Sequence, residues 1–337
     1  MLHRADKASR DVLITGGVEF LGAHLGAHLL ATSDAHVTVV DDLVDHGALQ
    51  NIEWLKSQAR DGRLNLVRGR THNTLLLADA ASTADEIYFL SEQCSTDDTG
   101  AMKAAWIVLE AARRSGLNPA LICASASGGL GGPSASRRPF AGKTAGEFST
   151  VARFVTEFAR HHQLPAVTLQ MDTVTGPRQF DESLDWVADT EYAILSGRRC
   201  RIAGDASEKH DVLHVSDAVQ ALLAARAYIG KIAGKGYWLG GGQTHQITVA
   251  EMVQLIERVC HRHAQVDAPW KKRGAAACTL LADPSFLVDT AWMPRRSIEE
   301  TVREIAAFWH ANRDSIATTE TATAQLSQQS AAPQKAA

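Results

Sequence analysis

The stretch DVLITGGVEFLGAHLGAHLLATSDAHVTVVDD, residues Asp11–Asp42, decides the fold of this chain. Val12–Thr15 is an apolar run rich in β-branched residues that ends at two glycines, so we expect a buried strand stopping at a tight turn. Apolar residues then recur at helical spacing from about Val18, and His36–Val40 is a second apolar run that closes on two aspartates. Strand, glycine turn, helix and strand in this order predict a dinucleotide-binding βαβ unit.

In such a unit the glycines let the backbone approach a pyrophosphate at the positive end of the helix. The usual spacing is Gly-x-x-Gly-x-x-Gly, but here the three positions are Gly16, Glu19 and Gly22. Two interpretations of Glu19 stay open. Its side chain could swing outward and cap the helix, where an acid contributes about 0.3–1 kcal/mol. Alternatively, its charge weakens, alters or abolishes cofactor binding, because the ligand is itself anionic.

Composition narrows the class of protein. The chain has 337 residues, ordinary apolar and charged fractions and a net charge of −4, with dispersed basic residues, so we expect no nucleic-acid footprint. No apolar run approaches the length of about 20 residues that spans a bilayer, and the N-terminal residues are polar, so we expect no membrane association. The five cysteines are unpaired in spacing and predict reduced thiols in a cytoplasmic protein.

Alternating strands and helices continue after Asp42 and predict an α/β fold, a Rossmann-type doubly wound parallel sheet. The expected strands are Leu64–Val67, Ala84–Leu90, Ala120–Ala124 and Ala166–Met171, and the expected helices are Leu49–Ala59, Met102–Arg114 and Phe148–His162. A long loop rich in glycine, serine and proline follows Ala124, at the strand end where open α/β sheets place their ligands.

The rhythm changes beyond Gly176-Pro177-Arg178, which predicts a smaller mixed α/β substrate domain. Its expected helices are Trp186–Leu195, Asp217–Tyr228, Val249–His263 and Ile298–Asn312, and its extended segments are Arg201–Ala203, Val212–Val215 and Tyr237–Leu239. The expected organisation is a flexible N-terminus over 1–10, a dinucleotide-binding domain over 11–178, a substrate-binding region over 179–314 and a disordered tail over 315–337.

Several segments resemble the extended short-chain dehydrogenase/reductases, specifically the NAD-dependent nucleotide-sugar epimerases, dehydratases and decarboxylases. These segments are TGGVEFLGAHL (Thr15–Leu25), VVDDL (Val39–Leu43), ADEIYFL (Ala84–Leu90), TGPR (Thr175–Arg178), GDASEKHDVLHVSDAVQALLAA (Gly204–Ala225) and ADPSFLVDTAWMPRRSIEETV (Ala282–Val302). The nearest resemblance is to UDP-glucuronate decarboxylases, which also have an Ile-Tyr pair in the fourth strand and a Ser-x-Ser after the fifth.

The resemblance implies NAD in the first domain, a UDP- or dTDP-sugar in the second, and a homodimer through the helices Met102–Arg114 and Phe148–His162. Asp41 would take the adenosine ribose. The implied cofactor-binding positions are Gly16, Gly17, Glu19, Phe20, Leu21, Gly22, Asp41, Asp42, Leu43, Arg70 and Leu90. The implied substrate-binding positions are Arg178, His210 and Arg273, of which His210 replaces an arginine, and Arg70 replaces an acid that would hold adenine.

The family's proton-handling residues do not have counterparts here. Family enzymes use a tyrosinate, a lysine four residues later and a serine or threonine after strand five, because an unperturbed phenol with a pKa of about 10 is a poor base. None of the four tyrosines is followed by lysine at the fourth position. The corresponding positions are occupied by Thr144, Phe148 and Ala126, and the nearby substitutes are Ser125, Ser127 and Lys143.

Two hypotheses follow. In the first, the protein is catalytically impaired and acts by binding NAD, weakly if at all, or a nucleotide-sugar, or as a partner subunit in a heterodimer with an active relative. In the second, it is an active NAD-dependent UDP-sugar epimerase, dehydratase or decarboxylase with a rearranged site. Losing one member of a catalytic unit already costs orders of magnitude in rate, which favours the first hypothesis. The histidine pairs His161-His162 and His261/His263 do not share a helix face, so we expect no metal site.

Overall fold

The structure is a computed structural model of the whole chain. The residues it describes are 9–43, 47–60, 62–69, 74–90, 98–126, 149–171, 173–180, 186–200, 206–207, 209–266 and 284–312.

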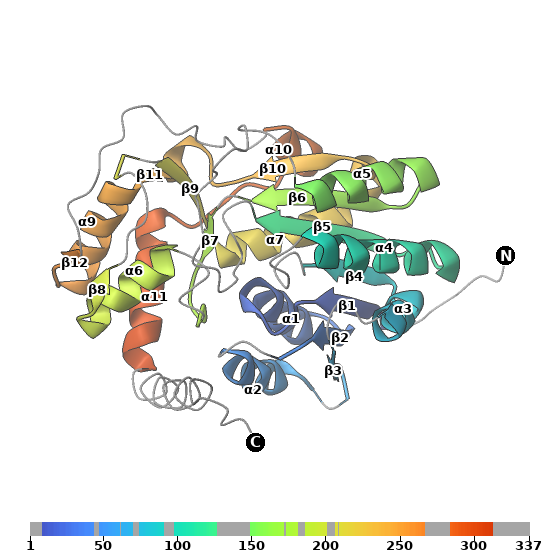
Figure 1. Cartoon of the computed structure of the whole chain (residues 1–337), viewed down its shortest axis with the longest axis horizontal. Coiled ribbons are helices and arrows are strands. Elements are labelled where there is room, and N and C mark those ends of the chain that lie inside the picture. Colours follow the sequence, from blue (N-terminus) through green and yellow to red (C-terminus); the bar gives the residue numbers. More distant parts are fainter. Residues whose placement is uncertain are drawn as a thin grey trace, which may run out of the picture.

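A seven-stranded parallel sheet forms the centre of the molecule, with strand order β10-β6-β5-β4-β1-β2-β3 (Figure 1). The strands are β1 (Asp11–Thr15), β2 (His36–Asp41), β3 (Leu64–Arg68), β4 (Glu86–Phe89), β5 (Ala120–Ala126), β6 (Ala166–Met171) and β10 (Gly236–Leu239). Because β1 lies between β2 and β4, the direction in which successive strands are added reverses there, as in doubly wound nucleotide-binding folds.

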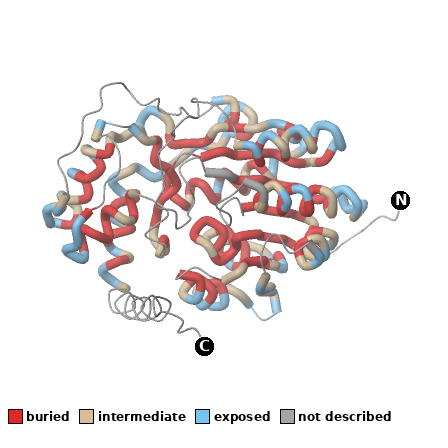
Figure 2. Tube along the Cα trace, in the orientation of Figure 1, coloured by how far each residue is buried: buried red, intermediate tan, exposed pale blue. Residues whose placement is uncertain are grey.

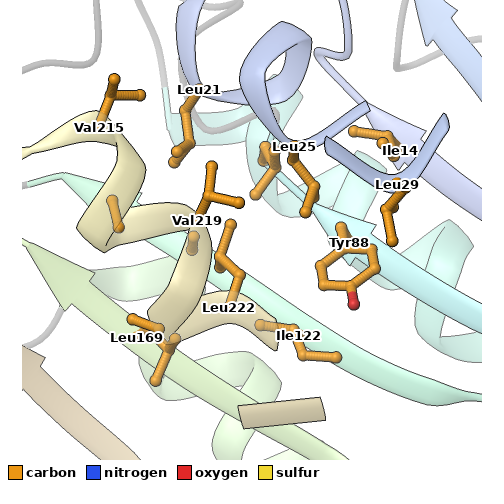
Figure 3. Close-up of a cluster of buried hydrophobic side chains, with 14 of the residues drawn as sticks. Ile14, Leu21, Leu25, Leu29, Tyr88, Ile122, Leu169, Val215, Val219 and Leu222 are labelled. Carbon is orange, nitrogen blue, oxygen red and sulfur yellow. The ribbon is translucent and has the colours of Figure 1, made fainter. Parts of the chain in front are cut away.

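Helices cover both faces of the sheet, so its inner strands β1, β4 and β6 are buried on both sides and read as nearly continuous apolar runs, whereas the edge strand β3 is partly exposed (Figure 2). One face packs against α1 (Phe20–Thr32), α2 (Ala48–Gln58) and α7 (Val215–Ala227). Leu21 and Leu25 of α1 meet Val215, Val219 and Leu222 of α7 over this face (Figure 3). The other face packs against α3 (Thr74–Thr83), α4 (Asp98–Ser115) and α5 (Thr150–His162).

A separate apolar cluster lies beyond the sheet, on the left of Figure 1, among α6 (Trp186–Ser196), α9 (Val249–Cys260) and α11 (Ile298–Ala311). Capping boxes start two of these helices: Thr248 pairs with Glu251 at α9, and Ser297 pairs with Glu300 at α11. The remaining elements are β7 (Thr173–Thr175), β8 (Arg199–Cys200), β9 (Lys209–His214), α8 (Ile229–Ile232), a 3₁₀ turn (Gln243–His245), β11 (Gln246–Thr248), β12 (Gln265–Val266) and α10 (Pro284–Thr290).

The doubly wound parallel sheet predicted from the sequence is confirmed. Helix α3 was not predicted, and the last turn predicted for Val249–His263 is wrong because His261 adopts a left-handed backbone (φ 51°) and ends α9 at Cys260. Of the strand expected near 201–203, the structure describes only the pair Arg199–Cys200; residues 201–205 lie outside the described residues. Among the described helices, none combines the length and hydropathy needed to cross a bilayer.

Candidate functional site

The candidate site lies at the carboxyl ends of β1, β2 and β4, where the strand order reverses. Gly16 leaves β1 with a left-handed backbone (φ 66°), and its N–H donates to the carbonyl oxygen of Val40 at 3.0 Å. A methyl group on Gly22 would lie 2.2 Å from the carbonyl oxygen of Gly16, and one on Gly17 would lie 2.6 Å from Cγ1 of Val39. The glycines therefore let α1 begin directly against the end of β1, which points its amino terminus at the crevice.

Asp41 closes β2 beside this glycine loop and is only 4% exposed. The N–H of Val18 donates to its Oδ2 at 3.2 Å, and the N–H of Leu43 donates to its Oδ1 at 2.9 Å. Asp41 is thereby held at the carboxyl end of β2, the position at which this kind of fold places an acid for a ribose hydroxyl. Asp42 and Leu43 follow it at the rim, half-buried, with Leu43 in a left-handed backbone (φ 61°).

Glu19 is the residue before the first turn of α1, but its side chain makes no capping hydrogen bond. A methyl group on Gly16 would lie 3.4 Å from Oε2 of Glu19 and 3.6 Å from the carbonyl oxygen of Leu90. The carboxylate is therefore turned back over the loop, beside Gly16 at the end of β1. The interpretation in which Glu19 swings outward as a helix cap is wrong for this structure.

Three other predicted cofactor positions, Phe20, Leu21 and Leu90, have buried side chains, which leaves their backbone atoms to face a cofactor. Phe20 and Leu21 are 7% and 3% exposed and pack into the core under the sheet. Leu90 is also buried, and its N–H donates to Oγ1 of Thr15 at 3.1 Å, which holds the end of β4 against β1. This role of Thr15 is not predicted from the sequence, although a hydroxyl at a strand end beside a glycine turn is well placed to bond a neighbouring strand.

Arg178 lies in a stacked arrangement at the junction of the sheet region and α11. Its Cζ is 4.2 Å from the ring centroid of Trp54 on α2 and 5.7 Å from that of Phe308 on α11. Partial burial lowers the pKa of its guanidinium from the ordinary value. Nearby, Nε2 of His24 donates to the carbonyl oxygen of Pro177 at 2.9 Å. Nothing in the local sequence indicated that Trp54 and Phe308 would meet this arginine, because they are distant along the chain.

His210 lies on β9, with its ring centroid 5.0 Å from that of Trp186. Burial lowers the pKa of its imidazole to about 4, so the ring is neutral at pH 7. A neutral ring cannot supply the positive charge of the arginine that it replaces. The next residue, Asp211, accepts N–H groups from Gly241 at 2.6 Å and Gly242 at 3.1 Å, and burial raises its pKa to about 6.

The positions expected to carry catalysis are mostly outside the described residues. Ser125 and Ala126 end β5, where their backbones pair with Gln170 and Met171 of β6 at the same edge as the glycine loop. The predicted positions outside the described residues are Arg70, Ser127, Lys143, Thr144, Phe148 and Arg273.

All four tyrosines of the chain lie within the described residues. Tyr88 is fully buried in β4, and its hydroxyl lies 3.5 Å from Oε2 of Glu86, at the start of that strand and so away from the glycine loop (Figure 3). Burial and the charge of Glu86 raise the pKa of the Tyr88 phenol well above its ordinary value. Glu86 in turn pairs with Arg10 at 2.6 Å and Arg226 at 2.7 Å, so this acidic group is neutralised from two sides.

The other three phenols are also placed away from the glycine loop. Tyr192 packs on Trp309 in the cluster beyond the sheet, with ring centroids 4.9 Å apart. Tyr228 is 44% exposed at the end of α7. The hydroxyl of Tyr237 donates to Oδ2 of Asp289 at 2.6 Å, and Lys235 pairs with the same oxygen at 2.9 Å. Tyr237 is therefore held at the contact between β10 and α10, away from the glycine loop.

Within the part of the chain that the structure describes, no group of three or more His, Cys, Asp or Glu side chains could hold a metal ion. The loop geometry and Asp41 fit a dinucleotide, because the glycines bring the amino terminus of α1 directly against the end of β1 and Asp41 closes β2 beside that loop. The carboxylate of Glu19 does not fit, because it lies where the backbone would approach the phosphates. Fold and site together define a doubly wound α/β protein of the dinucleotide-binding class with one discordant residue.

Residues 12–237, more than half of the chain, match the NAD dependent epimerase/dehydratase family, and the chain belongs to that family. A dTDP-glucose 4,6-dehydratase from Actinoplanes is 25% identical over 90% of this chain and 98% of the relative. A UDP-glucose 4-epimerase from Mycolicibacterium smegmatis is 28% identical over 88% of this chain and 97% of the relative. A CDP-paratose 2-epimerase from Salmonella typhi is 24% identical over 74% of this chain and 84% of the relative.

Solved structures show the same fold. A dTDP-glucose 4,6-dehydratase from Bacillus anthracis in complex with NAD superposes with a TM-score of 0.72 at 17% identity, covering 90% of this chain and 98% of the other. A UDP-glucuronic acid 4-epimerase from Bacillus cereus in complex with UDP-glucuronic acid and NAD gives 0.70 at 20% identity, covering 88% of this chain and 98% of the other. At these identities the likeness shows the fold, and the chemistry depends on the residues described above.

Proposed function

We propose that this protein is a catalytically impaired member of the NAD-dependent nucleotide-sugar epimerase and dehydratase family that binds a UDP- or dTDP-linked sugar and, more weakly, NAD. It acts as a binding protein or as the partner subunit of an active relative. Domain boundaries near residues 178 and 314 and a cytoplasmic location, as expected from the sequence, belong to the same proposal.

One observation carries the loss of catalysis. A phenol that removes a proton from a sugar hydroxyl must reach the crevice at the end of β1, with a cation beside it to lower its pKa. The chain has four phenols, and each lies away from the glycine loop: Tyr88 lies beside Glu86, Tyr237 donates to Asp289, Tyr192 packs on Trp309, and Tyr228 is at the end of α7.

Ligand binding is supported by what remains of the site. The glycine loop and Asp41 keep the geometry of a nucleotide cradle. The relatives are named for dTDP-, UDP- and CDP-linked sugars, and 84–98% of their length aligns with 74–90% of this chain. We therefore expect a nucleotide-sugar in the region covered by β9, α6 and α9, where the neutral His210 makes phosphate binding weaker than an arginine would.

The proposed dimer uses α4 and α5, which pack side by side on one face of the sheet. Trp106 of α4 is 51% exposed there, and a large exposed aromatic ring is typical of an interface centre. Sedimentation velocity of the wild type and of Trp106→Glu tests this part of the proposal. We expect a dimer that the substitution dissociates, and a wild-type monomer would contradict it.

The decisive experiment combines calorimetry and turnover on the full chain. Titrations with UDP-glucuronate, UDP-glucose, dTDP-glucose and NAD measure binding, and chromatography of each sugar nucleotide after prolonged incubation with NAD measures conversion. We expect at least one sugar nucleotide to bind and none to be converted. Conversion that requires NAD would overturn the proposal in favour of a rearranged active site, with Lys143→Ala as the first variant to examine.

A further inference from the structure

The carboxylate of Glu19 stands at the point where this class of loop normally leaves bare backbone. Its Oε2 would be 3.4 Å and its Cδ 3.5 Å from a methyl group on Gly16, so the side chain lies across the Cα of that glycine. The carbonyl oxygen of Leu90 is the next atom found there, at 3.6 Å. The carboxylate therefore lies beside Gly16 at the carboxyl end of β1, where the strand order reverses.

This orientation is not required by the helix itself. A residue preceding a helix normally turns its side chain toward the N–H groups of the first turn, and Ser149, Thr248 and Ser297 do so at α5, α9 and α11. Glu19 has the backbone of such a residue (φ −68°, ψ 171°) but makes no bond of this kind. The amino terminus of α1 keeps its attraction for anions while an anionic side chain already occupies the adjacent space.

From these observations we infer that Glu19 is a specificity-determining residue, which admits a nucleoside to the glycine loop but penalises a 5′-diphosphate. The inference rests on the proposed function, in that the loop must be a nucleotide site. The nucleoside is recognised through its ribose by Asp41, whose carboxylate is fixed by Val18 and Leu43. The diphosphate would have to approach Gly16 from the side on which the Glu19 carboxylate lies.

The charge and the size of the Glu19 side chain should affect ligand affinity differently. A series of adenine ligands and two substitutions separate the two effects. Calorimetric affinities for adenosine, AMP, ADP and NAD are measured for the wild type, Glu19→Gln and Glu19→Gly. Gln keeps the size and removes the charge, and Gly removes both and is well tolerated before a helix. Glu53→Gln is the matched control, because Glu53 is a 72% exposed carboxylate on α2 that pairs with Lys56 outside the loop.

We expect wild-type affinity to fall from adenosine to ADP, and Glu19→Gln to reverse this order. The ratio of ADP to adenosine affinity should rise at least tenfold in Glu19→Gln, which corresponds to about 1.4 kcal/mol of coupling. Glu19→Gly should bind NAD more tightly than either, while Glu53→Gln should follow the wild type. Added salt should reduce the difference between wild type and Glu19→Gln, because charge repulsion is screened.

If the wild type and both Glu19 variants showed the same relative affinities for adenosine, AMP, ADP and NAD, the inference would be overturned. The proposal of a nucleotide site would stand. Failure of every variant, including Glu19→Gly, to bind any adenine ligand would overturn it as well, because Glu19 would not be what excludes the diphosphate. The latter result would also remove NAD from the proposed function, whereas binding of a UDP-sugar in the separate titration would preserve its other part.

Discussion

Arg178 and Trp54 join the two halves of the chain, with the guanidinium carbon 4.2 Å from the centroid of the indole ring. Trp54 belongs to α2 beside the nucleotide loop, whereas Arg178 follows β7 and also faces Phe308 of α11. The arginine that the family resemblance placed on a substrate is therefore stacked on two aromatic rings in this structure. A planar guanidinium suits this arrangement better than an ammonium group does.

Arg178→Lys should lower the free energy of unfolding by about 1 kcal/mol, because the stack contributes about 0.5–2 kcal/mol and lysine cannot lie flat on the ring. Urea unfolding followed by tryptophan fluorescence measures this. Arg198→Lys is a comparison, because Arg198 stacks on Tyr192 at 4.3 Å within a single half of the chain. If the two substitutions changed stability equally but only Arg178→Lys weakened sugar-nucleotide binding, the substrate role would regain support.

Gly22→Ala should destabilise the protein near the upper end of the range of about 1–3 kcal/mol found for overpacking. The added methyl group would meet the carbonyl oxygen of Gly16 at 2.2 Å, and backbone cannot move aside as a flexible side chain can. Gly230→Ala in α8 is the control, because no atom lies within 4 Å of its added methyl group. We expect that control to be neutral or slightly stabilising, as for helical glycines generally. Equal thermal shifts in both variants would contradict the close approach of α1 to β1.

The protein should lose stability as the pH falls below about 6, because the buried imidazoles of His24 and His210 have a pKa of about 4. Unfolded histidine has a pKa of about 6.5, so the unfolded state takes up protons first on acidification. Asp211 acts in the opposite sense. Its pKa is about 6 in the folded protein, above that of an ordinary aspartate, so the folded state takes up this proton first and is stabilised as the pH falls below about 6. The pKa shifts of the two histidines and of the aspartate are similar in size, so the two histidines outweigh the aspartate and acidification destabilises the folded state.

Urea midpoints at about pH 7.5 and pH 5.5 test the sign of this effect. His210→Gln should reduce the loss on acidification, because it removes one of the groups that must be protonated on unfolding. His263→Gln is the control and should not reduce it, since His263 is 99% exposed. An acid loss that persists unchanged in His210→Gln would show that this imidazole is not responsible.

Tyr237→Phe should cost about 1.5–3 kcal/mol of stability, the usual range for a hydrogen bond to a charged group, because Asp289 loses a donor at 2.6 Å. Thermal unfolding monitored by circular dichroism measures the change. Binding of the sugar nucleotide should be unaffected, because this phenol lies between β10 and α10. A large loss of ligand affinity with unchanged stability would give Tyr237 a role in the site instead.

The sheet could be predicted from the sequence, because the spacing of apolar residues and the glycines at strand ends are local signals. Val12–Thr15 and His36–Val40 were expected as strands, and β1 and β2 pair in parallel as predicted. Helix α3 was missed because TLLLADAAST lacks a strong polar face, so its apolar residues do not stand out at helical spacing. The start of α9 carries a local sequence signal, the capping box at Thr248. Its end depends instead on the left-handed backbone of His261, which the sequence does not reveal.

The site was less predictable, since its properties depend on contacts between distant segments. The sequence showed that Glu19 is unusual but left its direction open, and the structure excludes the helix-cap interpretation because the side chain makes no capping bond and lies beside Gly16. His210 could be recognised as a replacement for arginine, but its neutrality follows from burial beside Trp186. The stack on Arg178 combines residues from three elements and has no local signal at all.

The seventh strand bears on how this chain could be divided. β10 lies beyond β9 and α7 in sequence, yet it pairs with β6 and completes the central sheet, with Tyr237 opposite Leu169. A fragment ending at Arg178 would expose the edge of β6 and would leave the α1 face of the sheet without α7. Any shortened version that keeps the whole central sheet must therefore extend past Leu239, so the proposed boundary near residue 178 marks where the substrate-binding segments begin and not where the sheet ends.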